Sequence, residues 1–148
     1  MEVMADPIDI KTLNLGYLQG ADLIQYLPEN YLEVVYDKQA DNLARAVQIA
    51  QGIVQGALGD IVDLTTEYTL TGTARNGIIL KLVIFMACYE IATGDEAIKK
   101  SLEKGYEDYL RMIASIKDGS TTLEGITSVS SDLRRAATIV SVKKRYLF

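Results

Sequence analysis

The residue types that most often do chemistry in proteins are scarce in this 148-residue chain. It has no histidine and a single cysteine, Cys88, which excludes a Ser-His-Asp triad, a His-Cys pair and a histidine metal site. Cys88 lies in the apolar run LVIFMACY, where a thiol is expected to be a small buried residue. The sequence therefore predicts no catalytic, metal-binding or cofactor-binding residue, and we expect the protein not to be an enzyme.

Carboxylates are numerous, but they are not arranged for acid–base catalysis. Glu107 and Asp108 are adjacent, and adjacent residues on a helix diverge by about 100°, so the two do not converge on one substrate. Glu67 is interpreted in the same way, as part of a solvated face. A small enzyme that uses carboxylates and tyrosines is kept only as a third functional hypothesis.

Nine tyrosines and a basic C-terminal cluster are better suited to contacts with other molecules. Tyrosine is enriched in interfaces because it combines apolar area with a polar tip. We expect Tyr89, Tyr106 and Tyr109 to pack in the core. The predicted interface residues are Tyr68, Leu70, Arg134, Arg135, Lys143, Lys144, Arg145, Tyr146 and Phe148.

Charge is unevenly distributed along the chain, whose formal net charge is −5. Residues 129–148 carry five basic side chains and one acidic one, a net charge of +4, so the rest of the chain holds −9. An acidic body repels a nucleic-acid duplex, and the basic patch at 143–145 is too small for a sequence-specific binder. A small regulatory protein that contacts nucleic acid or a partner through this basic tail remains the alternative function.

The first of three long helices is predicted over 38–59. Asp37 is a good N-cap residue, and apolar residues then recur at spacings of three and four, which places them on one helical face. Gly52 and Gly56 weaken this helix. They indicate either that it frays towards its end or that another helix approaches it closely.

The second and third long helices form a predicted hairpin. The helix over 74–93 is apolar nearly all round, which is typical of a helix buried by its neighbours, and Phe85 should be inside. Gly94 fits a helix stop and Asp95 the N-cap of an amphipathic helix over 95–118. The longest apolar run is too short to span a membrane.

These elements predict an all-α fold, a small helical bundle with three long helices and short N-terminal helices. An irregular segment (1–19) precedes the helical domain (20–119), and an extended Ser/Thr-rich arm (120–148) follows it. The threonines at 65–73 predict an extended loop with possible β character. A strand is the alternative to a helix for LEVVY at 32–36.

The layout resembles a family of tailed-phage and prophage proteins, the Mu-like family, and the wider group of helical head–tail connector (adaptor) proteins. The matching parts are GADLIQYLPENYLEVV, the long helix DNLARAVQIAQGIVQGAL, the apolar helix LKLVIFMACYEIA, and EKGYEDYLRMIASIKDG followed by TLEGI. The family pattern in the last helix and after it is matched by Tyr106, Asp108, Leu110, Ile113, Gly119 and Leu123. The resemblance covers roughly residues 20–126. This chain departs from it in a longer N-terminus, a long Ser/Thr arm and an apolar helix without an arginine-rich segment.

The resemblance implies a structural role in the neck of a virion, after synthesis in the host cytoplasm. Proteins of this kind form a homo-oligomeric ring, twelve-fold in the family, beneath the portal of the capsid, and they join it to the tail. The implied partners are the portal protein, neighbouring copies, and tail or stopper proteins, all contacted through the interface residues named above. DNA would pass through the channel without specific binding, and no membrane is involved. The arm from Ser120 onward is expected to become ordered only on assembly.

Overall fold

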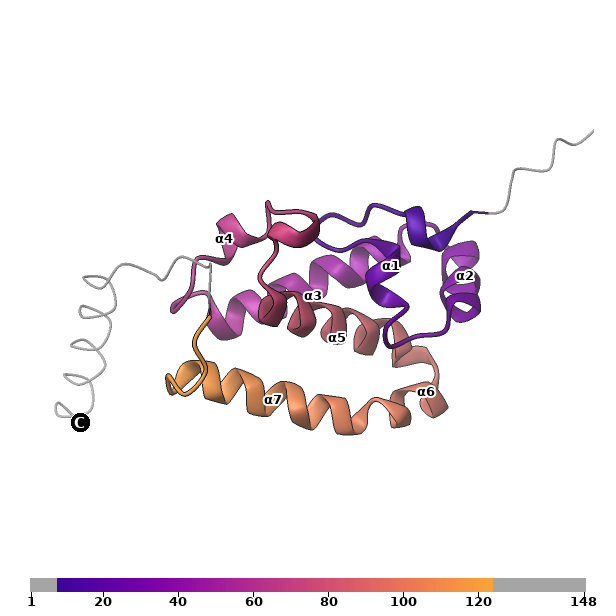
Figure 1. The fold of residues 1–148 in the computed structure, drawn as a ribbon. Helices are drawn as coiled ribbons and strands as arrows, with labels where there is room; N and C mark the ends of the chain where they lie inside the picture. The colour runs from indigo at the N-terminus through magenta and orange to yellow at the C-terminus, as the bar shows by residue number, and fades with distance from the viewer. Residues whose placement is uncertain (1–7, 124–148) are drawn as a thin grey trace, which may run out of the picture.

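The computed structural model describes residues 8–123, and the regular elements there are all helical (Figure 1). The all-α prediction is therefore confirmed for this part of the chain. In chain order the elements are η1 (Ile10–Thr12), α1 (Gly20–Leu23), α2 (Glu29–Lys38), α3 (Asn42–Leu58), α4 (Leu64–Glu67), η2 (Gly72–Ala74), α5 (Gly77–Ile91), η3 (Ala92–Gly94), α6 (Glu96–Ser101) and α7 (Glu103–Lys117).

Helix α5 is the centre of the bundle, with α3 on one side and α7 on the other (Figure 1). Seven consecutive residues, 82–88, are buried, so neighbours enclose the middle of this helix all round. Ile84 is 1% exposed and Phe85 is 4% exposed, which confirms that the predicted apolar helix lies in the core. By length and composition the helix from Gly77 to Gly94 could also cross a bilayer. An apolar surface on every side is equally what the central helix of a bundle requires.

Helix α3 is amphipathic, as its periodicity predicts. Its core face packs along α5, and it is helical through Gly52 and Gly56 to Leu58. The predicted start is wrong, since Asp37 lies inside α2 and α3 begins at Asn42. The buried residues of α3 are Leu43, Ala46, Val47, Ala50, Val54 and Leu58.

Two local predictions differ from the structure because short-range hydrogen bonds prevail over the pattern. The helix expected over 95–118 is interrupted at Leu102, whose N–H donates to the carbonyl three residues back, at Lys99 (3.0 Å). The segment 65–73 forms no strand. The carboxylate of Asp63 accepts from the N–H and the hydroxyl of Thr66, and these bonds start the helical turn α4. The possible strand at 32–36 is part of α2.

The segment before α1 contributes to the core although it has little regular structure. Ile10 and Leu18 are fully buried. The chain passes so close to itself that a Cβ added at Gly20 would overlap the carbonyl oxygen of Ile10, and the N–H of Gly20 donates to the carbonyl of Leu13 (2.9 Å). Glycine at position 20 is therefore required by backbone packing.

Aromatic side chains from α5 and α7 pack against one another. The ring of Phe85 lies 5.5 Å from that of Tyr26 and 6.1 Å from those of Tyr89 and Tyr109. Tyr106 stacks on Tyr89, with ring centres 5.0 Å apart. The prediction that Tyr89, Tyr106 and Tyr109 pack against the core is confirmed.

Truncation of the central aromatic ring tests this packing. We expect Phe85→Ala to lower the free energy of unfolding by about 3–5 kcal/mol, because it removes a buried ring and leaves a cavity. Leu110→Ala is the control, since Leu110 is 50% exposed and its truncation should cost the monomer little. Urea denaturation measures both. A loss for Phe85→Ala no larger than that for Leu110→Ala would contradict the central position of α5.

Candidate functional site

Of the nine predicted interface residues, the structure describes Tyr68 and Leu70. The other seven (Arg134, Arg135, Lys143, Lys144, Arg145, Tyr146 and Phe148) lie outside residues 8–123. The Tyr68 hydroxyl donates to the carbonyl of Gln51 on α3 (2.9 Å), and its ring lies 5.2 Å from that of Tyr17. Tyr68 therefore holds its loop against α3 within one subunit. Leu70 is half-exposed. The interface roles of both residues stay predictions.

Glu67 is buried, at 2% exposure, so its interpretation as a solvated carboxylate is wrong. It accepts a hydrogen bond from the Tyr17 hydroxyl (2.7 Å). Each of its oxygens also accepts from the backbone N–H of Asn76, at 3.1 and 3.0 Å. Burial, followed by this hydrogen bond to Glu67, raises the pKa of Tyr17, so the hydroxyl stays protonated at neutral pH. These bonds connect the N-terminal segment, α4 and the start of α5.

An ion pair lies beside Glu67. Arg75 Nη1 is 2.8 Å from Asp22 Oδ2, and it also donates to the carbonyl of Tyr17 (3.0 Å). The two charged side chains are only 9% and 13% exposed. We call Tyr17, Asp22, Glu67, Arg75 and Asn76 the polar clamp. Among residues 8–123 every buried side-chain nitrogen and oxygen has a hydrogen-bond partner. The polar groups of the clamp are therefore used within the fold, where they join segments that are distant in sequence.

Sequence reasoning missed the polar clamp because its members are far apart in the chain. Tyr17 and Glu67 are separated by 50 residues, and Asp22 and Arg75 by 53. No local periodicity reports such pairs. The one available signal is Asn76, a good N-cap directly before the apolar helix, which fixes where α5 begins.

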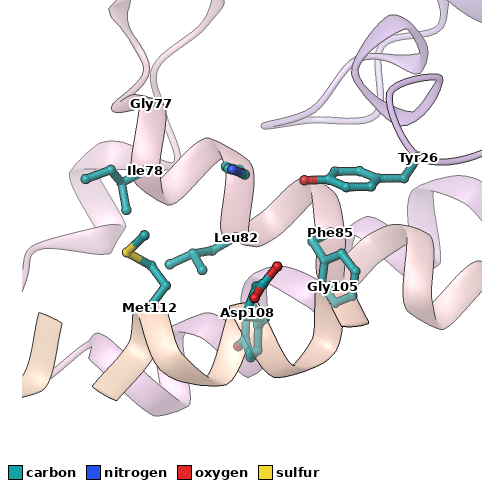
Figure 2. A pocket seen from close by; sticks show the side chains of 10 residues that line it. Tyr26, Gly77, Ile78, Leu82, Phe85, Gly105, Asp108 and Met112 are labelled. Carbon is teal, nitrogen blue, oxygen red and sulfur yellow. The ribbon is translucent and has the colours of Figure 1, made fainter. Parts of the chain in front are cut away.

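A cavity of about 330 Å³ opens between α5 and α7. Its walls are mainly apolar and include Leu82, Phe85 and Met112, but Lys81 also lines it. Figure 2 shows the Tyr26 hydroxyl and the Asp108 carboxylate turned towards it. Burial raises the pKa of Tyr26, so its hydroxyl is a neutral hydrogen-bond donor. The cavity can accept an apolar group with one polar end.

Cys88 is fully buried, as the sequence predicts, and its Sγ donates to the carbonyl of Leu23 (3.5 Å). Burial raises the pKa of its thiol to about 12, so the reactive thiolate is scarce at neutral pH. Within residues 8–123 no three potential ligands among cysteine, aspartate and glutamate gather closely enough to hold a metal ion.

The outward side of α3 is the most unusual surface described. Ile49 and Ile53 are each 40% exposed, and a Cβ added at Gly52 or Gly56 would meet no atom within 4 Å. Among the exposed residues from position 45 to 56, Arg45 is the one charge. We call Arg45, Ile49, Gly52, Ile53 and Gly56 the α3 glycine face. An exposed helical face normally carries several charges.

Comparison with known proteins adds no relative. A scan against protein-family models and searches of curated proteins and of solved structures found no match.

Removal of one hydroxyl tests the polar clamp. Tyr17→Phe leaves the buried Glu67 carboxylate with one donor fewer, so we expect the free energy of unfolding to fall by about 1–3 kcal/mol at pH 7. Tyr31→Phe is the control, because the Tyr31 hydroxyl makes only a 3.4 Å contact with the carbonyl of Ile91. Urea denaturation compares the two, and an equal loss would argue against the clamp.

The raised pKa of Tyr17 also predicts how the free energy of unfolding depends on pH in alkali. A tyrosine whose pKa is raised in the folded state contributes stability below its unfolded pKa, about 10, and loses that contribution as the pH rises further. The free energy of unfolding should therefore decline above about pH 10, less steeply in Tyr17→Phe than in the wild type. Parallel declines in the two proteins would show that Tyr17 does not titrate with unfolding.

Proposed function

We propose that this protein is a structural, non-enzymatic subunit of a phage neck, a head–tail connector (adaptor) that forms a ring beneath the portal and joins the capsid to the tail. Two things support the proposal. The order of the helices resembles that of the Mu-like family and the helical connector group. The α3 glycine face is suited to a contact between subunits.

The α3 glycine face carries the proposal, because no contact within residues 8–123 accounts for its composition. A glycine inside a helix costs about 0.5–1 kcal/mol relative to alanine. At Gly52 and Gly56 no neighbour within the described chain requires the missing Cβ. Two isoleucines are left exposed beside them. A second helix lying across this face would explain both the glycines and the isoleucines.

Electrostatics favour contact between copies at this face. Residues 8–123 carry sixteen acidic and ten basic side chains, a net charge of −6. Two acidic bodies repel each other, and the repulsion is least where acidic side chains are absent. Arg45 is the single charge of the face, and Asp41 already balances it at 3.1 Å.

The remaining parts of the chain take their roles from the same proposal. A ring of acidic bodies would repel DNA and let a genome pass through its channel. Tyr68 and Leu70, together with the residues of the C-terminal arm, would contact the portal, a neighbouring copy, or tail and stopper proteins. The protein would reside in the virion neck, without a cofactor and without contact to a membrane.

A bulky residue on the α3 glycine face should affect folding and assembly in opposite directions, so it tests the two separately. Gly52→Leu should raise the free energy of unfolding of the subunit by roughly 0.5–1 kcal/mol, because leucine is the better helix former and the position is open. The same change should abolish assembly, because it blocks the approach of the second helix. Gly94→Leu is the control, since Gly94 is also exposed with no atom near its Cβ position but lies outside α3.

Sedimentation velocity of the full-length chain measures its oligomeric state. Complementation measures whether each variant supports virion assembly. Loss of assembly in Gly52→Leu, with normal assembly in Gly94→Leu, supports the proposal. Normal oligomers and normal head–tail joining in Gly52→Leu would show that the α3 glycine face plays no part in assembly.

A further inference from the structure

A second exposed stripe has the same spacing of four, three and four residues as Arg45, Ile49, Gly52 and Gly56 of the α3 glycine face. It lies on α7, where five exposed residues follow one another at spacings of four and three and therefore share one side of the helix. Leu110, 50% exposed, is at its middle. We call this set the α7 stripe, and its members are Glu103, Glu107, Leu110, Ala114 and Lys117.

We propose that the α7 stripe of one copy packs along the α3 glycine face of the next copy, with the two helices parallel and Leu110 seated on Gly52. This inference rests on the proposed ring, and it names the two surfaces that meet. A ring needs such a pair, because a contact between two different patches closes into a ring while a self-complementary patch gives a dimer.

The parallel direction follows from the fold. Within one subunit α3 and α7 run the same way, and α5 runs opposite to both (Figure 1). Neighbours in a ring of about twelve copies differ by a rotation of roughly 30°. The α7 of a neighbour therefore arrives nearly parallel to α3.

The register follows from side-chain spacing. Arg45 precedes Gly52 by seven residues, and Glu103 precedes Leu110 by seven. At 1.5 Å per residue both separations are about 10 Å. With Leu110 on Gly52, the acidic Glu103 thus lies level with the basic Arg45. Among the described residues Glu103 has no ion pair of its own.

Small residues continue the match further along the two helices. Gly56 follows Gly52 by four residues, and Ala114 follows Leu110 by four, so two small residues face each other. Helices whose contact residues are this small can approach to the short end of the usual 8–10 Å separation. The side chain of Leu110 then fills the notch left at Gly52.

The antiparallel alternative is disfavoured by charge. Lys117 follows Leu110 by seven residues, so reversing α7 about Leu110 would bring Lys117 level with Arg45. Two positive charges would then oppose each other in the contact. In the parallel arrangement Lys117 instead lies near Gly59 and the exposed Asp60, which directly follow α3.

Exchange of the two charges tests the register in the full-length protein. Arg45→Glu and Glu103→Arg should each raise the dissociation constant of the assembly about five- to tenfold per contact, because each replaces attraction by repulsion. The double variant, Arg45→Glu with Glu103→Arg, should restore assembly, since the pair is present again in reverse. Lys100→Glu, an exposed charge change on α6, is the control and should leave assembly unchanged.

Sedimentation velocity over a range of concentrations measures each variant, and circular dichroism checks that each one is folded. A double variant that assembles no better than the weaker single variant overturns the pairing of α3 with α7. If Gly52→Leu abolishes assembly while neither charge variant changes it, the inference fails and the proposed connector stands. If the wild-type chain stays monomeric at every concentration and virions join heads to tails without it, both fail.

Discussion

The enclosure of α5 is the constraint on which the rest of the structure depends. A helix that is apolar on every side is stable in water only when neighbours cover it completely. Helix α3 covers one side, α7 another and α1 a third, and Ile10 and Leu18 of the segment before α1 are fully buried. Each covering helix uses one face for this purpose. The outward faces of α3 and α7 are therefore available for contacts with other molecules.

The polar clamp joins the N-terminal segment to α4 and to the start of α5. The N-terminal segment has little secondary structure, so its own hydrogen bonds cannot hold it in place. Tyr17 and Asp22 supply bonds from this segment to Glu67 and Arg75, and the backbone of Asn76 joins them at the start of α5. A buried charged group is costly unless all of its partners are present, so this arrangement specifies a single position for the segment. Among residues 8–123, the α3 glycine face is left uncovered by this arrangement.

How much could be predicted from sequence depended on how local each feature is. Periodicity predicts the central parts of α3, α5 and α7, and the Asp95 carboxylate caps α6 as expected. The start of α3 was predicted wrongly, because Asp37 belongs to α2 and Asp41 precedes α3. Glu67 was misjudged because its burial depends on Tyr17, 50 residues away. The helical turn at α4 was missed because one carboxylate, Asp63, outweighs the strand preference of the threonines that follow it. Gly52 and Gly56 are visible in the sequence, but only the structure shows that no side chain among residues 8–123 fills the space beside them.

The α3 glycine face and the α7 stripe are two different surfaces of one chain, so a contact between them can repeat around a ring axis. The central claim is that this 16.3 kDa chain works as a ring. Electron microscopy of the purified full-length protein at increasing concentration tests that claim most directly. The account predicts closed rings of uniform diameter with a central opening. Isolated subunits at every concentration, or open filaments in place of rings, would contradict it.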